Sequence, residues 1–338
     1  MTSKFQTLVE VPNYKWETGY SKHSLFMGSC FTENIGGKME ILKYPVDINP
    51  FGILYNPVSV AHGFHFLLKR KKFTKNDLIS HGGLWHSFYH HSRFSSHDPE
   101  KALEKINNRI SFSADFLENA EFLFLTFGTS WVYEYRATGQ IVSNCHKIPE
   151  KEFKRFRLEP GRIVEKYKKL LPEIWAKNPR LKVIFTISPI RHQRDGAIEN
   201  QRSKASLILA TDVLVKGFGE ERCAYFPGYE IMMDELRDYR FYSEDMIHLS
   251  ESAINHLWDI FRNSLIDEES NRISAEIKKI TNSLNHKPFN KYTKEHLNFL
   301  KSRQKELIVF QQKFPYINLI DERKYFSNQI SEIERVIK

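Results

Sequence analysis

Three short apolar runs, each set between helical patterns, constrain the fold of this chain most. They cover residues 25–27, 122–127 and 181–189, and the last is rich in β-branched side chains. Continuous runs of this kind are typical of strands buried on both faces of a parallel sheet. A short last strand is expected at residues 224–227. Because strands alternate with helices, the sequence predicts a three-layer α/β/α domain built on a doubly wound parallel sheet.

The first run leads into a predicted strand–turn–helix unit. Gly28 follows the strand and permits a sharp backbone turn, while Thr32 and Glu33 suit the start of a helix. Ser29 and Cys30 therefore lie in the turn, where a nucleophile points out of the sheet edge and the helix N-terminus favours an anion. A buried cysteine in an ordinary turn is the alternative interpretation.

The composition indicates a globular protein. Of 338 residues, 41% are hydrophobic and 14% aromatic, which suffices for a sizeable core and argues against disorder. The net charge is +9, but the lysines are scattered, so we expect no nucleic-acid partner. The first residues lack the apolar segment of a signal peptide, and no run of about 20 apolar residues occurs. We therefore expect no membrane partner and a cytoplasmic location.

The cysteines and histidines form no recognised metal pattern. Cys30, Cys145 and Cys223 lack CxxC spacing, which argues against a disulfide framework and a structural zinc site. Several histidines lie close together between residues 84 and 94. A metal site, a polar wall beside the active site and a solvated surface remain open interpretations of this cluster. We expect no metal and no cofactor.

Residues 28–32, Gly-Ser-Cys-Phe-Thr, resemble the signature of the GSCFA family, with Thr32 in place of alanine. That family resembles the SGNH/GDSL hydrolases, whose first block is Gly-Asp-Ser-Leu. A gapless alignment places Ser29 at the Asp and Cys30 at the nucleophilic serine. A shift by one residue would make Ser29 the nucleophile but would lose the glycine match. Further similar motifs extend the resemblance over roughly residues 20–260.

The resemblance also implies a base and its orienting partner. Asp245 and His248 have the Asp-x-x-His spacing of the last SGNH block. In such a turn the carboxylate accepts a hydrogen bond from the imidazole, and the other ring nitrogen reaches the nucleophile. The helix N-terminus and His248 would both lower the pKa of the Cys30 thiol, which predicts a thiolate at neutral pH.

Five further residues complete the expected site. The resemblance implies oxyanion donors: the Cys30 and Gly52 amides, with the side chain of Ser130 or Asn144. Ser130 stands where the related hydrolases have asparagine. Arg191 and His192 follow the third apolar run, where parallel strands deliver side chains to the ligand crevice.

The resemblance implies hydrolysis or transfer of an acyl ester, of a small molecule or a carbohydrate. A non-catalytic SGNH scaffold that binds a carbohydrate or an anionic ligand is the second hypothesis, because three motif positions depart from the hydrolase pattern. An interaction platform formed by the C-terminal helices is the third. The oligomeric state stays open.

The chain is expected to divide into two parts. Residues 1–265 form the predicted α/β domain, and residues 266–338 form a helical C-terminal extension rich in Lys, Glu, Asn and Leu. Pro288 divides this extension and Pro315 interrupts it again. The extension carries no candidate site residue, so the chemistry is not expected to need it.

Overall fold

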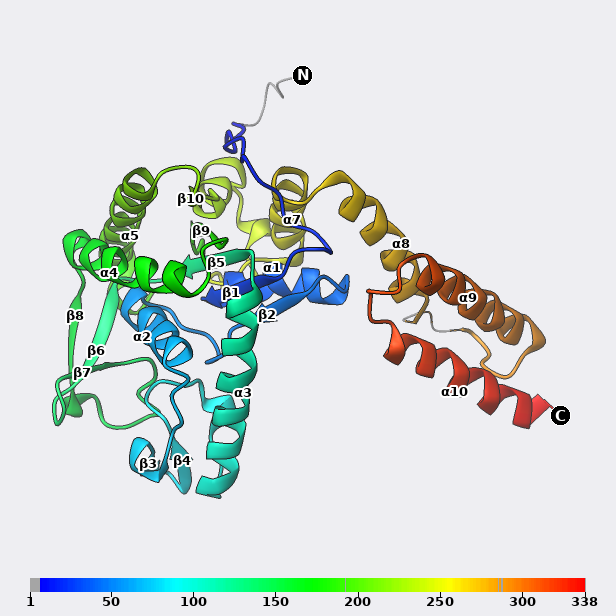
Figure 1. Ribbon diagram of the computed structural model, residues 1–338, viewed down its shortest axis with the longest axis horizontal. Coiled ribbons are helices and arrows are strands. Elements are labelled where there is room, and N and C mark those ends of the chain that lie inside the picture. Colours follow the sequence, from blue (N-terminus) through cyan, green and yellow to red (C-terminus); the bar gives the residue numbers. More distant parts are fainter. Residues whose placement is uncertain (1–6, 192, 285, 287, 338) are drawn as a thin grey trace.

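The structure is a computed structural model that describes residues 7–191, 193–284, 286 and 288–337 (Figure 1). The strands are β1 (Ser24–Gly28), β2 (Val46–Ile48), β3 (Ile79–His81), β4 (Leu84–His86), β5 (Phe122–Phe127), β6 (Trp131–Tyr135), β7 (Gln140–Val142), β8 (Phe153–Arg157), β9 (Lys182–Ile187) and β10 (Cys223–Tyr225). The helices are α1 (Cys30–Ile41), α2 (Pro57–Leu68), α3 (Pro99–Asn119), α4 (Pro160–Lys177), α5 (Gly196–Phe218), α6 (Gly228–Glu230), α7 (Glu251–Leu265), α8 (Glu268–Leu284), α9 (Lys294–Lys313) and α10 (Ile320–Ile337).

The centre of the molecule is a five-stranded parallel sheet in the order β2-β1-β5-β9-β10. The predicted α/β class with a parallel sheet is therefore confirmed. The strand order reverses between β1 and β5, because β2 lies on one side of β1 while later strands are added on the other. Open α/β sheets bind ligands beyond the carboxyl ends of their strands at such a reversal. A ligand site is therefore expected at the turns that follow β1 and β5.

Alternate side chains of the central strands pack against two different helical layers. Leu25 and Met27 pack in a core shared with α2, α3, α4 and α5, whereas Phe26 packs in a second core with α1 and α7. This alternation follows from the two-residue period of a strand. It buries both faces of the sheet and accounts for the continuous apolar runs.

Helix α4 contains a proline in its interior. The helix continues to Lys177 with Pro172 inside it. A proline in a helix interior costs about 3 kcal/mol. The turn beyond it buries Ile174 and Trp175, and the Trp175 indole donates to the carbonyl of Leu181 (2.9 Å). Burying two large apolar side chains contributes a comparable free energy, about 1.5–3 kcal/mol each.

Two smaller sheets lie beside the central one. Strands β7, β6 and β8 form an antiparallel sheet, and β3 and β4 form a hairpin. In Figure 1 they lie at the opposite end of the molecule from α8, α9 and α10.

The C-terminal region is helical, as predicted, and both Pro288 and Pro315 lie between its helices. It is also attached to the α/β unit. The Tyr20 amide donates to Ser270 Oγ (3.0 Å), Lys43 pairs with Glu322 (2.5 Å), and Ile273 shares the core of α1 and α7. A boundary at residue 266 therefore stays a prediction, because α8 contributes to that core.

The turn after β1 requires a glycine. Gly28 has φ +148°, and a Cβ atom there would lie 2.1 Å from the carbonyl oxygen of Thr126 on β5. The next amide, that of Ser29, donates to the same oxygen (3.2 Å). Only a residue without a side chain lets β1 turn so close to β5.

We expect Gly28→Ala to lower the free energy of unfolding by about 2 kcal/mol or more, because the methyl group meets rigid backbone in a strained conformation. Gly37→Ala is the matched control, since a Cβ at Gly37 in α1 meets nothing within 4 Å. Urea denaturation followed by circular dichroism measures both. Equal stability of the two variants would contradict this account of the turn.

Candidate functional site

Cys30, rather than Ser29, presents a side chain at the turn after β1. Cys30 is the first residue of α1 and is half-buried, with Sγ 4.0 Å from the hydroxyl of Tyr55. Ser29 is only 1% exposed, and its Oγ is buried without a hydrogen-bond partner. The thiol is therefore the more accessible nucleophile of the two.

The Cys30 thiol is not the low-pKa group that the sequence predicts. Burial raises its pKa above the ordinary value; the Tyr55 hydroxyl opposes this shift, and Glu33 in the first helical turn adds to it. Burial also raises the pKa of Cys145 to about 11 and that of Cys223 to about 12. Cys30 is thus a neutral thiol at neutral pH and needs a base to become a nucleophile.

Asn49 joins the loop after β2 to this turn. Its side-chain oxygen accepts from the Gly28 amide (2.9 Å), and its side-chain nitrogen donates to Glu33 (3.3 Å). Its carbonyl accepts from the Gly52 amide (2.8 Å) and from Arg93 (2.6 Å). Asn49 is fully buried with φ +45°, so it holds a strained backbone in order to make these contacts.

Gly52 does not offer its amide to an oxyanion in this structure, because that N–H already donates to Asn49. The glycine is required for a different reason. Its φ is +78°, and a Cβ would lie 2.2 Å from the Cβ of His91. Gly52 therefore permits a close approach between two loops.

The side chains of Ser130 and Asn144, which were also expected to donate to an oxyanion, make other hydrogen bonds in the structure. The Ser130 hydroxyl is fully buried and donates to Ser203 Oγ (3.1 Å) on α5. It fixes the turn after β5 to that helix. The Asn144 amide donates to Ser92 Oγ (3.4 Å), and its oxygen accepts from the His146 amide (2.9 Å).

Asn144 shares a cavity of about 470 Å³ with Tyr55, Cys145 and Arg194. Tyr55 also contacts Cys30. The structure thus relates Asn144 to Cys30 only through Tyr55.

Asp245 and His248 form the predicted pair. His248 Nδ1 lies 2.6 Å from Asp245 Oδ2, and Asp245 Oδ1 accepts from the His248 amide (2.9 Å). Met246 between them has φ +57°, so a strained turn brings the two side chains together. The hydrogen bond from His248 lowers the pKa of Asp245 to about 2, which keeps the carboxylate ionised at all physiological pH values.

The pair is open to solvent and is not yet in contact with the nucleophile. The side chains of His248 and Asp245 are 52% and 48% exposed. Among the described residues, no hydrogen bond or ion pair joins His248 to Ser29 or Cys30. Tyr242 and Met246 of the same loop line a cavity with Arg191, which follows β9. The loop therefore lies at the carboxyl edge of the sheet, the edge at which Cys30 stands.

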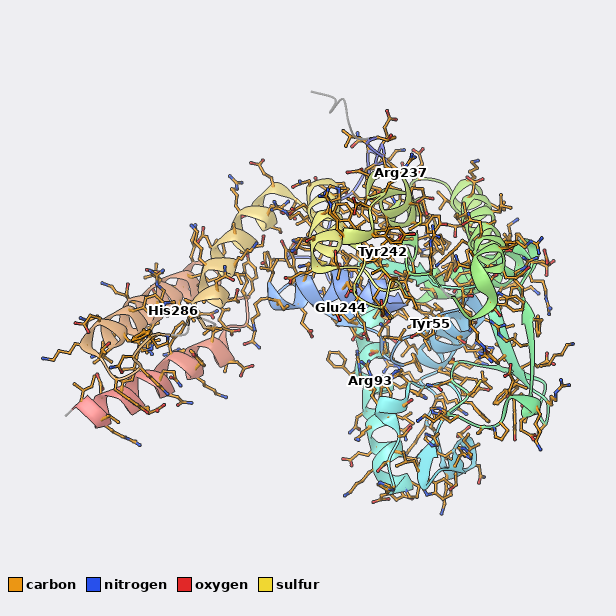
Figure 2. The ribbon with its side chains drawn as sticks, turned by 180° about the vertical axis from the view of Figure 1, so that it is seen from behind. Tyr55, Arg93, Arg237, Tyr242, Glu244 and His286 are labelled. Carbon is orange, nitrogen blue, oxygen red and sulfur yellow. The ribbon has the colours of Figure 1, made fainter. Side chains whose placement is uncertain are left out.

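Arg191 is placed at this edge as predicted, and His192 lies outside the described residues. Figure 2 shows Tyr55, Arg93 and Glu244 over the α/β unit, well separated from His286 in the C-terminal helices. None of the candidate site residues comes from those helices.

Two models of known families match the chain. The GSCFA family matches residues 24–261, and the C-terminal domain of GSCFA domain proteins matches residues 277–332. The first match covers well over half of the chain. The protein belongs to the GSCFA family. A search of curated proteins finds no match to it, so the relation to SGNH hydrolases stays a prediction.

Lys204 is a buried residue near the candidate site that sequence reasoning missed. Its ammonium group donates to the carbonyls of Gly128 and Ser188 (2.6 Å each), which directly follow β5 and β9. Burial, helped by the charge of Arg191, lowers the pKa of Lys204 to about 7. Lys204 therefore ties together the turns that follow β5 and β9. A lysine in the middle of an amphipathic helix gives no sequence signal of such a role.

Two histidines of the cluster in this GSCFA protein, His86 and His90, are buried, whereas His91 is partly exposed. His90 stacks among Phe51, Phe73 and Phe94, and burial lowers its pKa to about 3. His146 stacks on His86, and its Nε2 donates to the backbone carbonyl of Ser87 (2.8 Å); burial lowers the pKa of His146 to about 4. Among the described residues no three metal-binding side chains are placed to hold an ion.

No helix of the described chain is both long and apolar enough to pass through a bilayer.

The buried histidines predict an acid-sensitive fold. His90 and His146 stay neutral in the folded state but become protonated in the unfolded state below pH 6.5, so the unfolded state binds more protons. The free energy of unfolding should therefore be unaffected by these histidines above about pH 7. At pH 5 it should be lower by about 2 kcal/mol for each of the two histidines. His90→Phe should remove its share of this loss, whereas His65→Gln, at an exposed position of α2, should not. Urea denaturation at pH 7 and pH 5 measures the difference. An equal loss of stability in the wild type and in both variants would contradict the assignment of part of this loss to His90.

Proposed function

We propose that this GSCFA protein hydrolyses or transfers an acyl ester through a covalent intermediate on Cys30. The observation that carries the proposal is the 2.6 Å hydrogen bond between Asp245 and His248 Nδ1. It fixes the ring so that Nε2 is the free base, and the ionised carboxylate stabilises the imidazolium that forms. The pair is half-exposed in a strained turn at the carboxyl edge of the sheet, where a substrate can reach it.

The chemistry assigned to Cys30 follows from its raised pKa. A neutral thiol must lose its proton as it attacks, so His248 Nε2 takes that proton while Sγ bonds to the acyl carbon. The imidazolium then protonates the leaving alcohol as the C–O bond breaks, which leaves a thioester. Water, deprotonated by the same nitrogen, or a second alcohol releases the acyl group and restores the thiol.

Of the three donors that the resemblance implied, the proposal keeps the Cys30 amide and adds the Tyr55 hydroxyl. The Tyr55 hydroxyl lies 4.0 Å from Sγ, and the Cys30 amide at the start of α1 lies against its own thiol. The raised pKa of Tyr55, which burial causes, keeps this hydroxyl protonated and able to donate. Donors of this kind contribute about 3–4 kcal/mol each to the stability of the transition state.

The proposal requires the loop of residues 239–249 to move towards Cys30 when a substrate binds. This loop is suited to such a movement. Tyr239 is 78% exposed, and both His248 and Asp245 face solvent. Catalytic hydrogen bonds are often completed only in the complex with substrate.

A binding protein without turnover is the second candidate function. It is favoured by the separation of His248 from Cys30 and by the engagement of Gly52 and Ser130 in structural hydrogen bonds. The two functions differ in one measurable property, the release of product.

We expect turnover of 4-nitrophenyl acetate, with His248→Ala and Cys30→Ala each lowering kcat/KM by roughly 10²–10⁴-fold. Ser29→Ala should stay close to wild type, because its hydroxyl is buried and unpaired. His65→Ala is the control for loss of a histidine outside the site. Steady-state kinetics with correctly folded variants measures these effects.

Turnover that survives in His248→Ala would contradict the proposal. An absence of turnover for a range of acyl esters, together with ligand binding at this edge, would favour the binding protein.

A further inference from the structure

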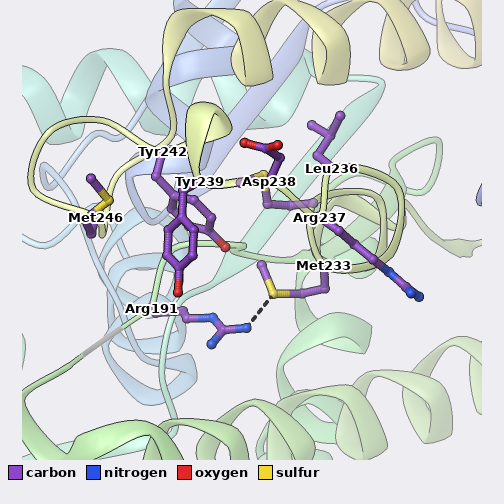
Figure 3. A pocket seen from close by; sticks show the side chains of 9 residues that line it. Arg191, Met233, Leu236, Arg237, Asp238, Tyr239, Tyr242 and Met246 are labelled. Atoms are coloured by element: carbon purple, nitrogen blue, oxygen red, sulfur yellow. Dashed lines mark hydrogen bonds between the residues drawn. The ribbon is translucent and has the colours of Figure 1, made fainter. Parts of the chain in front are cut away.

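A cavity of about 520 Å³ opens beside the Asp245–His248 turn (Figure 3). Its walls come from the end of β9, from the segment that follows α6 and from the loop of residues 239–249. The lining residues are Arg191, Met232, Met233, Leu236, Arg237, Asp238, Tyr239, Tyr242 and Met246. Nothing in the proposed chemistry uses this space.

Arg191 is the unusual member of the lining. Its Nη2 donates to the thioether sulfur of Met233 (3.1 Å), and its Nε is buried without a partner. A thioether is a weak acceptor, whereas a guanidinium carries five donors that match a carboxylate or a phosphate. Arg109 and Arg155 elsewhere in the chain are each paired with an aspartate. The charge of Arg191 is therefore held at a cavity wall without a carboxylate among its described partners.

The groups around Arg191 favour an anion with an apolar body. Figure 3 shows the hydroxyls of Tyr239 and Tyr242 directed towards the side of Arg191, while the carboxylate of Asp238 points the other way. Asp234, another acid of the segment that follows α6, pairs with Arg237 (3.0 Å). Met232, Met233, Leu236 and Met246 supply the apolar surface.

The cavity and the Asp–His pair share one loop. Tyr242 and Met246 line the cavity, and the Ser243 amide between them donates to the carbonyl of His248 (2.8 Å). A ligand held on Arg191 therefore lies against the loop that must move towards Cys30.

We propose that this cavity binds a carboxylate or phosphate group of the substrate, with Arg191 as its anchor, and thereby positions the ester beside His248. The assignment of the ligand as substrate rests on the proposed function; the anion site itself does not. A guanidinium group binds a carboxylate and a phosphate with the same donors. The experiment therefore compares one ligand of each kind.

Binding of benzoate, phenyl phosphate and neutral benzyl alcohol is measured by isothermal titration calorimetry, which needs no turnover. We expect at least one anion to bind, benzyl alcohol to bind at least tenfold more weakly, and Arg191→Gln to weaken the anion by tenfold or more. Arg191→Lys should recover part of the affinity. Arg180→Gln is the matched control, because Arg180 is exposed at the opposite end of β9.

If Arg191→Gln does not fold, modification of the wild-type protein by phenylglyoxal, mapped by peptide mass spectrometry, replaces it. The bound anion should protect Arg191 and leave Arg180 reactive. Equal binding of neutral and anionic probes, absence of anion binding, or unprotected Arg191 overturns the site. Anion binding without any ester turnover supports the site and counts only against the proposed hydrolase.

Discussion

The contact between Gly28 and the backbone of β5 is the constraint on which the rest of the site depends. Only glycine lets β1 turn within reach of the Thr126 carbonyl, and this contact places Cys30 at the first position of α1. The Gly28 amide then meets the side chain of Asn49, which brings the loop after β2 against the same turn. The strand, the helix start and the loop are thus fixed by the backbone of Gly28, where no side chain fits, and by the side chain of Asn49.

The order of the strands turns this local geometry into a site. The sheet reverses between β1 and β5, and Cys30 stands at this reversal, where open α/β sheets bind their ligands. Lys204 ties together the turns that follow β5 and β9, and the loop of residues 239–249 approaches from the end of β10. A rigid edge and one exposed loop are the arrangement expected of a site that closes on its ligand.

The sequence predicted the features that follow from periodicity and from single motifs. The apolar runs predicted the parallel sheet, and the Asp-x-x-His spacing predicted a hydrogen bond that local geometry alone can form. Prediction from the sequence failed where the role of a residue depends on hydrogen-bond or packing partners that are distant in the chain. The amide of Gly52 and the hydroxyl of Ser130 are engaged by Asn49 and Ser203, and burial raises the pKa of Cys30 where a motif suggested the opposite. Lys204 and Tyr55 were missed for the same reason, since packing rather than spacing gives them their roles.

The most direct test of the account is the identity of the residue that carries the acyl group. The protein is mixed with an excess of 4-nitrophenyl acetate, quenched in acid during turnover, and analysed by intact mass and peptide mapping. The account predicts one acetyl group on the peptide that contains Cys30, removable by neutral hydroxylamine as a thioester, formed more slowly in His248→Ala and absent from Cys30→Ala. An acetyl group on Ser29, or ester consumption with no adduct on Cys30 at any time after mixing, would contradict it.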